Sequence, residues 1–196
     1  MRYSWARTIS NVLSPPVIWG ALAFPIAFHH AESREQALLW ALTYVIMVCG
    51  IPALYIALMV RLGKITDLHM QVRQQRIAPF LVSIVSTALA WGILRLMGAP
   101  SLLPLFALVS LVLLCAMLLV TLVWQISMHS MSITCAVVTT GALYGLGAAL
   151  LVSPLIALVA MARLSLRRHT PAELIAGGLL GGGITMLFLL VLNPLA

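Results

Sequence analysis

Residues 161–181 read MARLSLRRHTPAELIAGGLLG, and they concentrate charge in a chain that is otherwise apolar. Arg163, His169 and Glu173 follow the pattern RxxxxxHxxxE, directly before a segment rich in glycine. Proline is favoured in the first turn of a helix, so we expect a helix to begin near Pro171. Glu173 then lies in that first turn, about one helical turn from His169, where its carboxylate can contact the imidazole. The stretch predicts a boundary between two membrane helices that carries a cation, a potential nucleophile and an acid that orients it.

The composition places this stretch in a polytopic membrane protein. Hydrophobic residues make up 63% of the 196 residues and charged residues only 8%, and the mean hydropathy is +1.13. A helix needs roughly 20 apolar residues to cross a bilayer, so the chain suffices for six or seven spans and has little left for a soluble domain. We therefore predict an all-α bundle of six to seven spans, in which residues 1–196 form a single transmembrane domain.

The basic residues argue against a nucleic-acid partner, although the formal net charge is +7. They lie at the ends of apolar segments and do not form a solvated patch with interleaved aromatic residues. Cys49, Cys115 and Cys135 are widely separated within apolar runs, which predicts neither a disulfide framework nor a metal site. We expect the lipid bilayer as a partner, and neither a metal nor another cofactor.

The order of the apolar segments predicts how the polar stretches are placed. A segment at 16–28 is short and contains Pro25, so we expect it to be tilted, kinked or partly inserted, whereas residues 131–162 suffice for two short helices. Two crossings return a chain to the side that it left. The polar stretches around Arg76, around His129 and at 163–173 should therefore meet at one membrane face, as a site built from three segments requires. The remaining spans are expected at 37–60, 80–96, 102–124 and 171–192.

Cationic residues also precede the span at 80–96. His69, Arg73 and Arg76 lie at positions i, i+4 and i+7, hence on one face of any helix through them. Such a face is either a solvated surface among lipid headgroups or a phosphate clamp, because guanidinium groups match phosphate oxygens in bidentate geometry.

The residue types at the predicted face suit phosphoryl transfer without a metal. Arginines can hold a phosphate and neutralise the charge that develops on its oxygens. One neutral imidazole can attack phosphorus while a carboxylate holds its tautomer, and a second, protonated imidazole can give a proton to the leaving oxygen. Ordinary interfacial charges are the alternative for any single residue of the group.

The stretch at 161–181 resembles the third signature of the type 2 phosphatidic acid phosphatase superfamily, SRxxxxxHxxxD followed by a helix that contains glycine. Arg163, His169 and Pro171 stand at their usual places. Ala162 replaces the serine, and Glu173 replaces the aspartate with the same charge.

The other two signatures of the family are matched in part. Residues 126–129, ISMH, keep Ser127 and His129 of the second signature, PSGH. In the first signature, KxxxxxxRP, Arg76 keeps the arginine but is followed by IAP, and His69 stands where the lysine would be.

The resemblance covers residues 64–183 and implies a helical membrane enzyme that removes phosphate from a lipid or isoprenoid phosphate or diphosphate. It implies a phosphohistidine intermediate and no metal, with His169 as the nucleophile, Glu173 as its orienting partner and His129 as the general acid. The remaining polar residues would hold the phosphate: Arg76, Arg163 and Ser127, with Arg73 or His69 in place of the missing lysine.

Two other functions compete with this one. Met128 puts a bulky side chain where the family's glycine allows close backbone approach to phosphate, so the alternative is a degenerate relative that serves as a membrane scaffold or as a subunit of a larger complex. A prenyltransferase or small transporter ranks last, because Asp67 is the only aspartate and no charged residue lies deep in a predicted span.

The distribution of charge also predicts an orientation. All lysines and arginines except Arg34 and Arg95 fall on the side of the predicted site, which the positive-inside rule places at the cytoplasmic face, and we expect a prokaryotic inner membrane. The N-terminal segment has a basic start and an apolar run without a small-residue cleavage site, so we expect it to be retained as a first span or signal anchor.

Overall fold

The computed structural model describes residues 4–29, 31–67 and 72–192, and every regular element in these ranges is helical. This confirms the predicted all-α class. Five helical segments are long and apolar enough to cross a membrane, or six if the bent pair of α1 (Ser4–Val12) and α2 (Pro15–His29) counts as one broken span. By length and hydropathy the chain is therefore a polytopic integral membrane protein, with five or six candidate spans where the sequence predicted six to seven.

The chain divides into two compact units, residues 19–125 and residues 1–18 with 126–196, and each is described by itself. The unit of residues 19–125 holds most of α2, which contains Pro25, and a helical segment over Arg34–Arg61. Pro52 has no N–H, and its ring would clash with the carbonyl of residue 48 in a regular α-helix, which accounts for the π-helical stretch η1 just before it. The further elements of this unit are α3 (Arg34–Tyr44), η1 (Val45–Gly50), α4 (Ile51–Arg61), η2 (Arg73–Arg76), α5 (Ile77–Leu96) and α6 (Leu102–Thr121).

The core of this unit is fixed by one buried polar contact and a ring stack. The hydroxyl groups of Tyr44 and Ser110 lie 2.7 Å apart, and the ring of Tyr44 stacks on that of Phe106 with 5.2 Å between their centroids. A buried hydroxyl that is hydrogen-bonded avoids the cost of desolvation, so this pair ties α3 to α6 without an exposed polar group. The spans predicted at 37–60, 80–96 and 102–124 correspond to Arg34–Arg61, α5 and α6.

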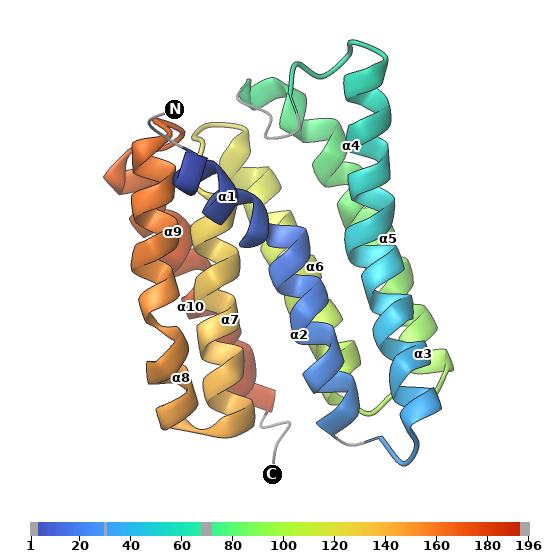
Figure 1. The fold of residues 1–196 in the computed structure, drawn as a ribbon. Helices are drawn as coiled ribbons and strands as arrows, with labels where there is room; N and C mark the ends of the chain where they lie inside the picture. The colour runs from blue at the N-terminus through green and yellow to red at the C-terminus, as the bar shows by residue number, and fades with distance from the viewer. Residues whose placement is uncertain (1–3, 30, 68–71, 193–196) are drawn as a thin grey trace. The chain divides into compact units, whose positions relative to one another are not determined.

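The other unit contains α1 and the last four helices of the described chain. The chain reverses after α7 at Gly145, whose φ of +86° is readily adopted only by glycine. Residues 131–162 thus hold two consecutive helical segments, as predicted, and Pro154 begins the second of them, α9. Figure 1 shows α9 running beside α7, with α1 against the end of α9. The helices are α7 (Met128–Tyr144), α8 (Leu146–Val152), α9 (Pro154–Ser165) and α10 (Pro171–Leu192).

Two glycines let α10 lie directly on α7. A Cβ atom at Gly177 would overlap the backbone carbonyl of Ser127, and one at Gly181 would overlap that of Met131. The hydroxyl of Thr134 also donates to the carbonyl of Gly178 over 3.0 Å, so the two helices share a polar contact. Small residues permit this close approach of helix backbones. The close packing at these positions holds the start of α7 against the first turns of α10.

Candidate functional site

His169 and Glu173 form a hydrogen-bonded pair where α10 begins. The Nδ1 atom of His169 lies 2.9 Å from Oε2 of Glu173, and the histidine is only 8% exposed. A carboxylate accepts hydrogen bonds, so Nδ1 carries the proton and donates it. In the neutral imidazole this tautomer places the lone pair on Nε2. The pair therefore has the geometry that a nucleophilic imidazole and its orienting carboxylate need, and the predicted contact between the two residues is confirmed.

The same carboxylate also caps the helix. Oε2 of Glu173 accepts the backbone N–H of Thr170 over 3.1 Å, and the backbone N–H of Glu173 donates to Oγ1 of Thr170 over 3.3 Å. This reciprocal arrangement is a capping box, with Pro171 at the first helical position, which explains why the helix begins there. The pattern TPAE carries this signal in the sequence, although the capping box was not among the predictions. A capping box forms with any residue at 169, so the histidine contact is additional to it.

Ser127 and His129 lie at the start of α7, beside the first turn of α10. Ser127 caps α7, since its hydroxyl accepts the N–H of Ser130 over 3.3 Å, and its own N–H donates to the carbonyl of Glu173 over 3.1 Å. His129 is the second residue of the helix and is buried. Met128, at the first position, is half-buried. The backbone contact with Glu173 therefore brings the second predicted signature to the third.

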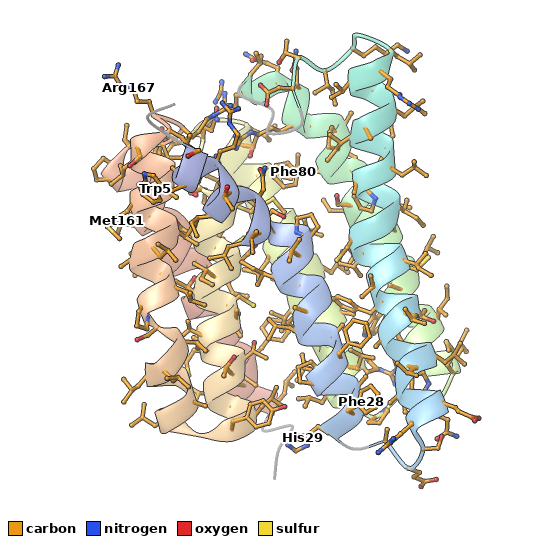
Figure 2. The ribbon with its side chains drawn as sticks, viewed as in Figure 1. Trp5, Phe28, His29, Phe80, Met161 and Arg167 are labelled. Carbon is orange, nitrogen blue, oxygen red and sulfur yellow. The ribbon has the colours of Figure 1, made fainter. Side chains whose placement is uncertain are left out.

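Arg163 reaches the same end of the unit from the last turn of α9. Its side chain is only 2% exposed, and its Nη1 atom donates to Oγ of Ser10 on α1 over 2.8 Å. Nε2 of His129 lies 3.0 Å from the backbone carbonyl of the same serine. Ser10 thus links Arg163 to His129. Arg167, in the turn after α9, is exposed and points away from the helices (Figure 2).

Two sets of hydrogen bonds therefore join the predicted site residues of this unit. Ser10 was not predictable from the sequence, because nothing local to residue 10 indicates a contact 119 residues away. One set joins Arg163 and His129 through Ser10, and the other joins His169 and Ser127 through Glu173.

The predicted phosphate-binding residues of the first signature belong to the other unit. Arg73 and Arg76 bound the single 3₁₀ turn η2, where a separation of three residues puts both on one side. Nη1 of Arg73 donates to the carbonyl of Leu122 over 3.0 Å, and Arg76 is buried. His69 lies outside the described residues. That these three residues share a phosphate site with His169 stays a prediction.

The groups that could hold a metal are sparse in this fold. Among residues 4–29, 31–67 and 72–192, no three histidine, cysteine, aspartate or glutamate side chains gather at one place.

No protein-family model, curated protein or solved structure matches the chain significantly. The resemblance to the lipid phosphatases thus depends on the motif residues and their contacts.

Proposed function

We propose that the protein is an integral membrane phosphatase that hydrolyses a lipid or isoprenoid phosphate or diphosphate through a phosphohistidine, without a metal. The observation that supports it most is the contact of 2.9 Å between Nδ1 of His169 and the carboxylate of Glu173. It directs the lone pair to Nε2, and the capping box alone does not call for a histidine at this position. The buried guanidinium of Arg163, linked through Ser10 to His129, supplies a cation for phosphate oxygens.

The residues support a mechanism in two steps. In the first step, Nε2 of His169 attacks phosphorus, the bond from phosphorus to the leaving oxygen breaks, and the His129 imidazolium gives that oxygen a proton. In the second step, water attacks the phosphohistidine, its proton passes to the now neutral His129, and the bond between phosphorus and nitrogen breaks to release inorganic phosphate. Arg163 would neutralise charge on the phosphate oxygens in both steps.

The test is phosphate release from a panel of substrates. We expect detergent-purified protein to release phosphate from at least one member of a panel of phosphatidate, isoprenyl phosphates and isoprenyl diphosphates in the presence of a chelator. Rapid quenching during turnover of a radiolabelled substrate should leave protein-bound label that is stable to alkali and lost in acid, as expected of a phosphohistidine. A substrate that turns over only with an added divalent metal would contradict the proposed chemistry.

Met128 favours a second function, a degenerate relative that acts as a membrane scaffold or subunit. Its half-buried side chain stands at the first position of α7, next to the capping Ser127. Failure of every substrate in the panel, with reproducible co-purification of the same partner proteins, would support this function over the phosphatase.

We also propose that this site faces the cytoplasm, from the excess of lysine and arginine on its side of the chain. Arg167 suits a test because it is exposed in the turn between α9 and α10. A cysteine in the variant Arg167→Cys should resist an impermeant thiol reagent added to intact cells and react once the cells are permeabilised. The unsubstituted protein is the control for Cys49, Cys115 and Cys135, and labelling of the variant in intact cells would place the site outside.

A further inference from the structure

The N-terminal helix α1 turns one polar side chain into the site. Its buried residues are Ala6 and Ser10, and Ser10 is only 2% exposed. A buried serine needs hydrogen-bond partners, because an unsatisfied hydroxyl costs free energy. Ser10 finds them on Arg163 and His129, the proposed phosphate ligand and the proposed general acid. This position lies outside all three signatures.

The contact with Arg163 holds a buried guanidinium in one place. Nη1 of Arg163 donates to Oγ of Ser10 over 2.8 Å, and both side chains are almost fully buried. A guanidinium carries five N–H donors in a planar fork, so one bond to serine does not exhaust its capacity for phosphate. The bond instead holds the long side chain in place before the anion binds, so less rotational freedom is lost on binding.

The contact with His129 determines which nitrogen can exchange a proton. Nε2 of His129 lies 3.0 Å from the backbone oxygen of Ser10 and 3.3 Å from its hydroxyl. A carbonyl only accepts, so Nε2 carries a proton and donates it. Because Nε2 keeps its proton, the second proton of the imidazolium is gained and lost at Nδ1. Nδ1 is therefore the nitrogen that would give its proton to the leaving oxygen.

We propose that Ser10 is a positioning residue that fixes Arg163 and His129 for a phosphate group, through its hydroxyl and its backbone carbonyl respectively. The identity of the ligand rests on the proposed function, whereas the positioning of the arginine rests on the hydrogen bonds of Ser10. Ser10 acts through the two residues and needs no contact with the substrate. The N-terminal helix is thereby part of the site.

Binding of inorganic phosphate to the full-length protein in detergent tests the role of the hydroxyl without any need for turnover. Ser10→Ala should bind phosphate roughly tenfold more weakly by calorimetry, because the arginine loses one charge-assisted hydrogen bond. Thr8→Ala is the matched control, since Thr8 is exposed on the same helix and its hydroxyl donates to the carbonyl of Ser4 over 3.0 Å. This control should bind phosphate as the wild type does.

Equal binding by Ser10→Ala and the wild type would overturn the proposal, as would the absence of phosphate binding to the wild type. Tighter binding by Ser10→Ala would also overturn it, because the hydroxyl would then compete with phosphate. A wild type that shows the expected Ser10 effect but hydrolyses no substrate would sustain this inference and contradict the proposed function. A wild type that hydrolyses a substrate, with no effect of Ser10→Ala on phosphate binding, would support the proposed function and contradict this inference.

A double-mutant cycle separates positioning from a general structural role. Ser10→Ala should lower kcat/KM roughly tenfold in the wild-type background and much less in the Arg163→Lys background, because lysine lacks the planar fork that the serine holds. Similar losses in both backgrounds would show that Ser10 does not act through Arg163. Thermal unfolding of each variant, compared with Thr8→Ala, shows whether lost binding reflects lost folding.

Discussion

Replacing His169 by alanine should abolish phosphate release from any substrate that the wild-type protein hydrolyses. The imidazole supplies the atom that forms the covalent intermediate, and removal of a nucleophile costs on the order of a thousandfold or more in rate. Protein-bound label should disappear together with turnover. The measurement is initial rate and trapped radiolabel for wild type and variant at equal concentrations of folded protein.

His29→Ala is the matched control for this loss. His29 is an exposed histidine in the last turn of α2 (Figure 2), and its replacement should leave the rate unchanged. Glu173→Gln adds a second comparison, because its side-chain oxygen can still accept the N–H of Thr170 and keep the cap, while the charge facing His169 is lost. We expect this variant to fold normally and to lose much of its activity. A His169→Ala variant that keeps wild-type turnover would show that the phosphoryl group passes through another residue.

Replacing Gly177 by alanine should strongly destabilise the unit that contains the site. The new methyl group would overlap the carbonyl of Ser127, so α10 must move away from α7. Alanine gains roughly 1 kcal/mol of helix propensity over glycine, and we expect overpacking of about 1–3 kcal/mol or more to outweigh it. Because Ser127 caps α7 just before His129, phosphate release should fall as well.

Gly183→Ala provides the control on the same helix. Nothing lies within 4 Å of a Cβ atom at this glycine, so only the gain in helix propensity acts, and stability should stay constant or rise. Unfolding in mixed micelles, followed by loss of helical circular dichroism, compares the two variants. Equal unfolding midpoints for Gly177→Ala and Gly183→Ala would contradict the close packing of α10 on α7.

The local features of the fold were predictable because they depend on neighbouring residues. Hydropathy over windows of span length located Arg34–Arg61, α5, α6 and α10, and the start of α10 followed from Pro171. The contact between His169 and Glu173 was also predictable, since a separation of four residues near a helix start brings two side chains together.

The contacts between distant segments were not predictable in this way. The bond from the N–H of Ser127 to the carbonyl of Glu173 is a backbone contact, and backbone groups carry no residue-specific signal. The first signature was expected on a longer helical face, whereas Arg73 and Arg76 occupy one 3₁₀ turn. That Arg73 and Arg76 share a site with His169 stays a prediction. The number of membrane crossings indicates on which face of the membrane a residue lies, but not how far it lies from another residue on that face.

The sequence by itself determined that this protein is a helical membrane protein, where most of its spans lie, and that His169 has a carboxylate partner. These properties follow from hydropathy and from separations of three or four residues along a helix. Only the tertiary structure decided that Ser10 of α1 joins Arg163 to His129, and that Gly177 and Gly181 bring α7 against α10. Such contacts depend on how helices far apart in the chain pack together, and packing is a property of the assembled fold.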